Sequence, residues 1–349
     1  MTDATLPSGL SGVPLATGEL NRKDFASDQE VRWCPGCGDY SILATFQGLL
    51  PQLGIRRENT VIVSGIGCSS RFPYYMNTYG VHSIHGRAPA LATGIAIARP
   101  DLSVWVVTGD GDALSIGGNH LIHALRRNVN ITIMLFNNRI YGLTKGQASP
   151  TSEIGKVTKS TPKGLVDEPF NTVALALGAG ATFVARTMDS SRAHLAETLA
   201  AAVGHRGASL VEIYQNCQIF NDGAFDALKG PDSGLIPLVH GQPVVFGKDG
   251  SQCVYRTAEG SLAVGPTDQA PDGSIIVHDA HREDAGLASE LAALTDLGVI
   301  RRSPIGIFRD VDHPTHDDLA RAQVTMADDP AERLAALQDY VTGPDTWTV

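Results

Sequence analysis

The sequence contains few charged residues, and this scarcity excludes several classes of protein. Charged residues make up 18% of the 349 residues, the net charge is −10, and no run of Lys or Arg is longer than two. Nucleic acid and anionic membranes are bound mainly through basic clusters, so neither is an expected partner. No stretch reaches 18 consecutive apolar residues, and the N-terminal residues lack the basic and apolar regions of a signal peptide. We therefore expect a cytoplasmic protein.

Cysteine is also scarce, with five residues in the whole chain. Five cysteines in a chain of this length do not form a disulfide scaffold. In a cytoplasmic protein such cysteines more often bind metals or take part in catalysis. The sequence is instead rich in glycine, with 37 residues, and 43% of it is hydrophobic. This composition is typical of an α/β enzyme with many short loops.

Apolar strands and helical segments alternate from about residue 40 to residue 217. Continuously apolar strands separated by helices predict an α/β fold, in which a parallel sheet has helices on both faces. Ligands of such sheets lie at the carboxyl ends of the strands, where glycine and asparagine interrupt this sequence. The expected helices are 41–54, 115–128, 170–179 and 190–205, and the expected strands are 60–67, 103–112, 131–138, 181–186 and 209–216.

Changes in composition along the chain divide it into three parts. Residues 1–25 mix Pro, Gly, Ser and Thr and are expected to form an N-terminal arm. Residues 26–230 form the predicted α/β domain. Residues 231–349 form a smaller C-terminal extension, in which Lys-Asp-Gly and Ala-Glu-Gly predict the turns of hairpins. Within this extension, 283–341 looks helical and then looped.

Two polar motifs follow neighbouring strands of the predicted sheet. Gly109-Asp110-Gly111-Asp112 ends one strand, and Asn137-Asn138 ends the next. Either motif alone is more often an ordinary turn. Together they indicate a magnesium and phosphate site, because Mg²⁺ prefers oxygen ligands shared with phosphates and glycine lets the backbone approach a diphosphate closely.

The cysteines form a second candidate site. Cys34-Pro35-Gly36-Cys37 places two thiols on one tight turn, a spacing that suits zinc, an iron–sulfur cluster or a redox dithiol. Cys68 and Cys217 follow predicted strands and could complete four ligands. Cys217 could equally be a buried structural cysteine. Cys253 has no companion and is expected to be inert.

The first pair of motifs resembles the diphosphate-binding motif of thiamine-diphosphate enzymes, which opens with GDG and closes with NN. Five segments in order resemble the β subunit of 2-oxoacid:ferredoxin oxidoreductases, most closely those of the 2-oxoglutarate type. They are WCPGCGD, GIGCS, HGRAPALATGIA, GDGDALSIGGNH and NNRIYGLTKGQASPTS. The resemblance covers roughly residues 30–225.

The resemblance implies three cofactors and assigns residues to each. It implies Mg²⁺ on Asp110, Asn138 and the Ile140 carbonyl, and one [4Fe–4S] cluster on Cys34, Cys37, Cys68 and Cys217. Thiamine diphosphate would be lined by Gly111, Asp112, Gly142 and Leu143, with Cys68, Ser69, Ser70, Arg71 and His85 beside it.

The resemblance also implies the reaction and its partners. A 2-oxoacid is oxidatively decarboxylated, coenzyme A takes the acyl group and ferredoxin takes the electrons. Only one α/β domain of this kind is found, so a separate α subunit would supply the pyrimidine-binding domain and its activating glutamate, in an αβ or (αβ)₂ assembly. A non-oxidative thiamine-diphosphate decarboxylase remains an alternative, although it has no need of four thiolates.

Lys145 bears on the choice of 2-oxoacid. It follows the predicted magnesium ligands, so its ammonium could pair with the distal carboxylate of 2-oxoglutarate, giving succinyl-CoA as product. Pyruvate has no second carboxylate and would leave this charge unpaired. Lys145 could instead be an exposed loop lysine or a diphosphate contact, which leaves pyruvate or another 2-oxoacid as alternative substrates.

Overall fold

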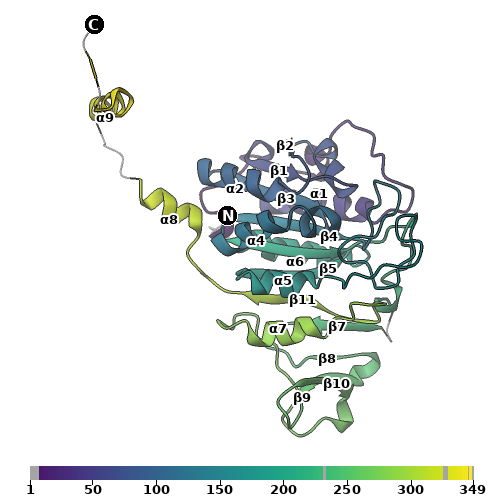
Figure 1. The fold of residues 1–349 in the computed structure, drawn as a ribbon. Helices are drawn as coiled ribbons and strands as arrows, with labels where there is room; N and C mark the ends of the chain where they lie inside the picture. The colour runs from purple at the N-terminus through teal and green to yellow at the C-terminus, as the bar shows by residue number, and fades with distance from the viewer. Residues whose placement is uncertain (1–7, 231–232, 325–328, 345, 348–349) are drawn as a thin grey trace.

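A central eight-stranded sheet organises the molecule (Figure 1). The computed structural model describes residues 8–230, 233–324, 329–344 and 346–347. The strand order is β2-β1-β3-β4-β6-β5-β11-β7. The strands are β1 (Thr60–Ser64), β2 (Tyr79–His82), β3 (Ser103–Gly109), β4 (Ile131–Asn137), β5 (Phe183–Met188), β6 (Ala208–Tyr214), β7 (Gly234–Leu238) and β11 (Arg302–Asp310).

Six of these strands run parallel to one another, and five of them are the strands that the sequence predicts. Each neighbouring pair is hydrogen-bonded in parallel, from β2 through β1, β3, β4 and β6 to β5. Every residue of β4, β5 and β6 is buried, which explains why these segments read as apolar runs. A parallel sheet buries both faces, so successive side chains on each strand enter two separate cores.

Helices cover the two faces and complete these cores. The helices are α1 (Asp39–Leu53), α2 (Ala88–Ala98), α3 (Asp110–Leu114), α4 (Gly118–Arg127), α5 (Thr172–Gly178), α6 (Arg192–Gly204), α7 (Gly286–Ala293), α8 (His316–Ala322) and α9 (Pro330–Thr342). Val104 and Val106 of β3 belong to the core to which α2, α4, α5 and α7 contribute, whereas Trp105 and Val107 belong to the core to which α1 and α6 contribute. The predicted layering is therefore confirmed. Short 3-10 helices are η1 (Ser8–Leu10), η2 (Arg22–Phe25), η3 (Arg57–Asn59), η4 (Ser69–Tyr75), η5 (Asp226–Leu228), η6 (Lys248–Gly250) and η7 (Thr267–Gln269).

The chain after residue 230 adds two strands to the main sheet. β11 pairs antiparallel with β5, and β7 pairs parallel with β11. The expectation of helix followed by loop over 283–341 is therefore wrong for 302–310. Pro304 and Gly306 interrupt this segment and arginines flank its apolar residues, so its sequence lacks a clear strand pattern. Strand β2 was also not expected, because it is short and lies largely exposed at the sheet edge.

A second, three-stranded sheet of order β10-β9-β8 lies beyond β7. Its strands are β8 (Val245–Phe246), β9 (Gln252–Arg256) and β10 (Leu262–Pro266). Both neighbouring pairs are antiparallel, with Lys248–Gly250 joining β8 to β9. The hairpins predicted from the Lys-Asp-Gly and Ala-Glu-Gly turns are therefore present.

Residues 8–25 pack against the α1 and α6 face of the sheet. Leu10, Val13 and Phe25 are almost fully buried there. Their apolar contacts anchor this part of the N-terminal segment to the main domain. None of the helices among the described residues combines the length and the apolar character that crossing a bilayer requires.

Candidate active site

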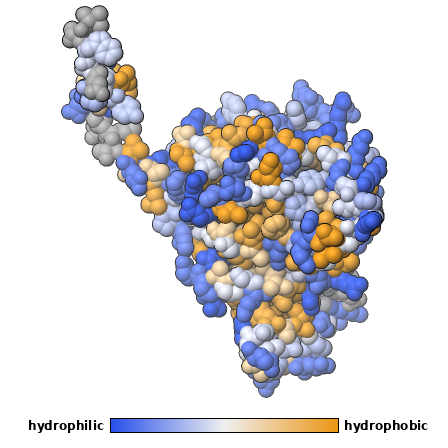
Figure 2. Space-filling model, viewed as in Figure 1, coloured by the Kyte–Doolittle hydropathy of each residue, from blue (hydrophilic) through white to orange (hydrophobic). Residues whose placement is uncertain are grey.

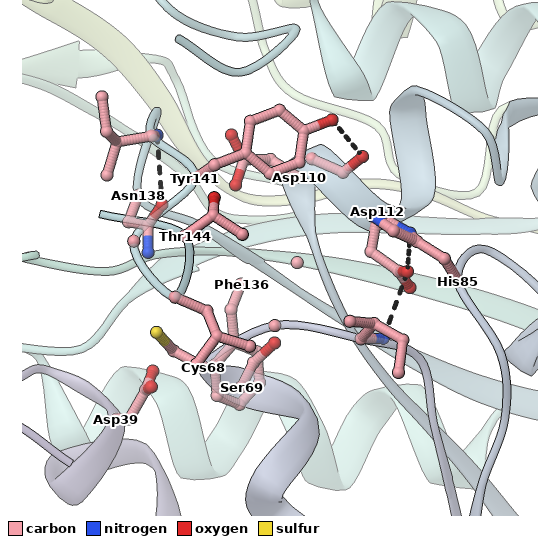
Figure 3. Close-up of a pocket in the computed structure, with 17 residues that line it drawn as sticks. Asp39, Cys68, Ser69, His85, Asp110, Asp112, Phe136, Asn138, Tyr141 and Thr144 are labelled. Carbon is pink, nitrogen blue, oxygen red and sulfur yellow. Dashed lines mark hydrogen bonds and ion pairs between the residues drawn. The ribbon is translucent and has the colours of Figure 1, made fainter. Parts of the chain in front are cut away.

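Four loops that carry the sequence motifs meet at one edge of the sheet. They follow the carboxyl ends of β1, β3, β4 and β6, which lie side by side in this order as parallel strands. Seventeen residues line a pocket there (Figure 3). The pocket lies at the place where open α/β sheets bind ligands.

Asp110 lies at the base of this pocket. It is 2% exposed, and its Oδ2 accepts hydrogen bonds from the Ser149 hydroxyl at 2.5 Å and the Thr151 hydroxyl at 2.6 Å. Burial raises the pKa of the Asp110 carboxyl, although these hydrogen bonds act in the opposite direction. A buried carboxylate is most stable when a cation compensates its charge, so Asp110 is suited to hold a metal ion.

The two asparagines of the second motif have different surroundings. Asn137 is buried and donates to Glu212 Oε1 at 2.7 Å, so it belongs to the interior. Asn138 lines the pocket, and its Oδ1 accepts a hydrogen bond from the Ile140 amide at 3.1 Å. Ile140 also lines the pocket. The structure thus brings Asp110, Asn138 and Ile140 together, as a shared magnesium site requires.

Asp112 ties several loops to one another. Its Oδ1 accepts hydrogen bonds from the backbone amides of Ile66 and Gly86, and its Oδ2 accepts one from the Thr108 hydroxyl. His85 Nδ1 lies 2.5 Å from the same carboxylate. The Asp112 carboxylate is therefore occupied by the protein, and it fixes the loops around the pocket rather than presenting a free charge to it.

Two glycines lie where the loop after β4 meets its neighbours, and at Gly111 the close approach requires glycine. A Cβ on Gly111 would lie 2.2 Å from the Tyr141 ring, and the Tyr141 hydroxyl donates to the Gly111 carbonyl at 2.9 Å. A Cβ on Gly142 would lie 3.4 Å from Cys68 Sγ and 3.6 Å from Cys217 Sγ. Gly142 therefore brings the backbone beside the pocket against two of the four sulfurs.

The four predicted cysteine ligands surround a second pocket that shares a wall with the first. Cys68, Asn138, Gly142 and Leu143 line both, and Cys34, Cys37 and Cys217 line the second. Burial, followed by the nearby Asp39 carboxyl, raises the pKa of the Cys68 thiol to about 12. Burial also raises the pKa values of Cys37 and Cys217. Thiolates at this place need a compensating positive charge, which a metal centre supplies. Cys253 is fully buried on β9 and lines neither pocket.

The remaining predicted residues divide between the two pockets. Ser69 and His85 line the first pocket, and Arg71 and Lys145 line the second. Ser70 is buried, and its hydroxyl has no hydrogen-bond partner among the described residues.

Asp39 is a pocket residue that the sequence reasoning missed. It is 1% exposed, and neither carboxyl oxygen has a hydrogen-bond partner within the described residues. Burial, with a contribution from Asp189, raises the pKa of the Asp39 carboxyl to about 7. Figure 3 shows Asp39 beside Cys68, on the side of the pocket away from Asp110. Its position directly after Cys-Pro-Gly-Cys-Gly is the one signal that the sequence offered.

Ser149, Thr151 and Arg139 are further residues that the sequence reasoning did not assign. Each contacts Asp110 directly or through one neighbour. Ser149 and Thr151 belong to the Ala-Ser-Pro-Thr-Ser segment at the end of the family motif.

Comparison with known proteins agrees with this arrangement. The family model for the thiamine pyrophosphate enzyme C-terminal TPP-binding domain matches residues 65–213. The chain is 62% identical over 342 residues to 2-oxoglutarate oxidoreductase subunit KorB of Mycobacterium tuberculosis, covering 97% of this chain and 91% of the relative. It is 48% identical over 190 residues to 2-oxoacid:ferredoxin oxidoreductase 1, subunit beta, of Aeropyrum pernix, covering 54% of this chain and 60% of the relative.

A solved structure has a similar fold over most of its length. It is 2-oxoglutarate:ferredoxin oxidoreductase from Magnetococcus marinus with 2-oxoglutarate, coenzyme A and succinyl-CoA bound. The TM-score is 0.73 at 33% identity, and the match covers 93% of this chain and 99% of that chain.

Proposed function

The chain belongs to the family of 2-oxoacid:ferredoxin oxidoreductase β subunits, and we propose that it binds thiamine diphosphate and a [4Fe–4S] cluster in an enzyme that oxidises 2-oxoglutarate. In this reaction the 2-oxoacid loses CO₂, coenzyme A takes the succinyl group, and electrons pass through the cluster to ferredoxin. The carrying observation is that the Asp110 pocket and the four-cysteine pocket share a wall.

The first pocket is the proposed thiamine diphosphate site. When bound, thiamine diphosphate supplies the carbanion and the electron sink for decarboxylation. Asp110, Asn138 and the Ile140 carbonyl would hold Mg²⁺, which prefers oxygen ligands shared with phosphates. Gly111, Gly142 and Leu143 would border the diphosphate, and Asp112 would hold the loops in place through its hydrogen bonds to Ile66 and Gly86.

The second pocket is the proposed cluster site. Among the described residues, no group of three or more His, Cys, Asp or Glu side chains is arranged to hold a single metal ion. A tetrahedral zinc site needs all its sulfurs at about 2.3 Å from one ion, whereas a cluster binds each thiolate through a different iron and accepts wider spacing. A non-oxidative decarboxylase would have no use for these four thiols, which favours the oxidative reaction.

A separate α subunit would complete the active site. Thiamine enzymes activate the aminopyrimidine ring with a glutamate from a pyrimidine-binding domain, and the described residues contain one α/β domain of the diphosphate-binding kind. We propose an αβ or (αβ)₂ assembly with ferredoxin as the external electron acceptor.

The test measures thiamine diphosphate binding by the assembled complex, using titration calorimetry with and without Mg²⁺. The Asp110→Ala variant should lose Mg²⁺-dependent binding, because the diphosphate charge loses its metal anchor. The wild-type complex should bind thiamine diphosphate. It should then reduce an electron acceptor only when both 2-oxoglutarate and coenzyme A are present. Unchanged affinity in Asp110→Ala would contradict the assignment of this pocket.

A further inference from the structure

Two buried arginines connect the C-terminal extension to the candidate magnesium site. Arg139 directly follows Asn138 and is 3% exposed, and Arg186 of β5 is 1% exposed. Both guanidinium groups donate hydrogen bonds to the segment 295–304, which runs from the end of α7 into the start of β11. A buried guanidinium without partners is strongly unfavourable. The position of this segment therefore depends on the two arginine side chains, and the positions of those side chains depend on the segment.

The Arg139 side chain is held at three backbone carbonyls. Nε donates to Thr151 O at 2.7 Å, Nη1 to Gly298 O at 2.8 Å and Nη2 to Leu297 O at 2.6 Å. Its backbone has a φ of +59°, in the left-handed region that non-glycine residues rarely adopt. Such backbone conformations persist where surrounding contacts determine them, and they concentrate at functional sites.

The contact with Thr151 leads directly to Asp110. The Thr151 hydroxyl lies 2.6 Å from Asp110 Oδ2 and 2.9 Å from Asn137 Oδ1, and its single proton serves one of them at a time. The Arg139 amide also donates to Asn137 Oδ1, at 3.1 Å. Arg139 thus contacts both the asparagine motif that presents Asn138 and the residue whose hydroxyl bonds to Asp110.

Arg186 supports the asparagine motif through Glu212. Its Nε donates to Glu212 Oε2 at 2.6 Å, and Glu212 Oε1 accepts from Asn137 Nδ2 at 2.7 Å. On its other side, Arg186 Nη1 donates to Thr295 Oγ1, Ser303 Oγ and Pro304 O. The segment 295–304 is therefore joined to the asparagine motif by two independent hydrogen-bonded routes.

We propose that Arg139 is a positioning residue of the magnesium site, and that the segment 295–304 of the C-terminal extension is its outer support. This inference rests on the proposed function, since it assigns a role toward the Mg²⁺ that Asp110 and Asn138 would hold. It gives the extension a part in cofactor binding: Leu297 and Gly298 fix the guanidinium, which fixes Thr151 and through it the Asp110 carboxylate. Residues that orient metal ligands affect metal affinity by about 10- to 100-fold.

The experiment measures Mn²⁺ affinity of the assembled complex in the presence of thiamine diphosphate, by the electron paramagnetic resonance signal of free Mn²⁺. Arg139→Met should bind Mn²⁺ about 10- to 100-fold more weakly than the wild type. High Mg²⁺ should restore turnover, because the variant changes metal affinity rather than the reacting groups.

Arg321→Met is the matched control. Arg321 also joins the extension to the main domain, through the Ala96 and Ile97 carbonyls of α2, and it contacts neither Asp110 nor Thr151. Its loss should lower the melting temperature and leave Mn²⁺ affinity unchanged. If Arg139→Met does not fold, Arg139→Lys is the second variant. It keeps the positive charge but lacks the planar guanidinium group with its several donors, and it should still weaken Mn²⁺ binding.

The outcomes separate this inference from the proposed function. Wild-type affinity for Mn²⁺ in whichever Arg139 variant folds would overturn the role of Arg139 while leaving the magnesium site intact. A wild type that binds no Mn²⁺ with thiamine diphosphate would overturn the site itself. An equal loss of affinity in Arg321→Met would show that any weakening of the extension has this effect, and would also overturn the specific role of Arg139.

Discussion

Lys145 has a φ of +76° and lines the pocket that the four cysteines surround. Gly146 follows it with a φ of +95°, so the loop makes a tight turn here. The Lys145 amide donates to the Gly142 carbonyl at 3.1 Å, which ties it to the loop against Cys68 and Cys217. The Lys145 side chain is exposed in this chain, and we propose that its ammonium meets the substrate beside the four-cysteine pocket.

We predict that Lys145→Ala raises the Michaelis constant for 2-oxoglutarate by about tenfold or more, and raises those for pyruvate and 2-oxobutyrate much less. Removing the ammonium leaves the distal carboxylate of bound 2-oxoglutarate unpaired, and pyruvate and 2-oxobutyrate have no second carboxylate to lose a partner. Steady-state kinetics on the three substrates measure this. Lys159, an exposed lysine further along the same connection, supplies the control Lys159→Ala. Equal effects on all three substrates would assign Lys145 to the cofactor or to the fold.

The cysteines give a second prediction at the level of single residues. Replacing Cys34, Cys37, Cys68 or Cys217 by Ala should lower the bound iron and sulfide, because each thiolate is one of four proposed ligands. Cys253→Ala should retain both, since Cys253 is buried on β9 away from the pockets. Iron and sulfide are measured on anaerobically purified complexes. Full iron content in Cys217→Ala would remove that residue from the ligand set.

Local motifs made some site residues predictable, and distance along the chain hid the others. Asp110, Asn138 and Cys37 stand in short patterns whose chemistry is readable within a few residues. The role of Thr151 depends on Asp110, 41 positions away, and that of Arg139 on Gly298, 159 positions away. No local pattern reports such contacts. Asp39 adjoins a motif, but its burial without a hydrogen-bond partner among the described residues is a property of the folded pocket.

The same contrast holds for the helices and strands. Strands β1, β3, β4, β5 and β6 were predictable because burial on both faces demands continuous apolar runs. Strand β11 was not, since its sequence contains Pro304, Gly306 and two arginines at its ends. It is nevertheless almost wholly buried, because β7 and β5 cover its edges. Pairing with the neighbouring strands, rather than the local β-propensity of the sequence, determines that this segment forms a strand.

His278 links β11 to the preceding loop and makes stability depend on pH. It is 1% exposed, its Nε2 donates to Ile307 O at 2.7 Å, and its Nδ1 has no partner within the described residues. Burial lowers the pKa of His278, and the nearby His240 and His281 act in the same direction, whereas the Ile307 carbonyl and Asp279 oppose it. A second proton would place an unpaired charge in the interior.

We predict that the stabilisation from neutral His278 is fully present above the ordinary histidine pKa of 6.5 and is lost as the pH falls below it. In that range the unfolded chain binds a proton that the folded chain does not, so unfolding is favoured. His278→Gln keeps an amide donor for Ile307 and should show a smaller fall in melting temperature from pH 8 to pH 5.5. His316→Gln, on a partly exposed residue of α8, is the control. An unchanged pH slope in His278→Gln would contradict this account.

At the scale of the whole molecule, apolar side chains are exposed on the long connection between β4 and α5. Ile154 is 52% exposed, Val157 69% and Val166 86%. Hydrophobic patches are also visible among the hydrophilic residues in Figure 2. Exposed apolar groups are typical of interaction surfaces, which fits a chain that works in an assembly.

We predict that the isolated chain shows no 2-oxoacid-dependent turnover, and that activity appears when the α subunit is added. The proposed reason is that the glutamate which activates the aminopyrimidine comes from the partner. The assay follows reduction of an artificial electron acceptor by each chain alone and by their mixture. Substitution of the partner's activating glutamate by glutamine should abolish the restored activity. Robust turnover by this chain alone would contradict the prediction that the α subunit supplies this glutamate.

The most direct test of the account is the visible absorption of the anaerobically purified complex before and after addition of 2-oxoglutarate. Thiamine diphosphate beside a cluster predicts a broad iron–sulfur band that bleaches when substrate is added, because electrons enter the cluster. The bleaching should be absent in Asp110→Ala, which keeps the four cysteines but loses the proposed anchor of the diphosphate. A colourless complex containing zinc, or an iron–sulfur band that 2-oxoglutarate does not change, would contradict the account.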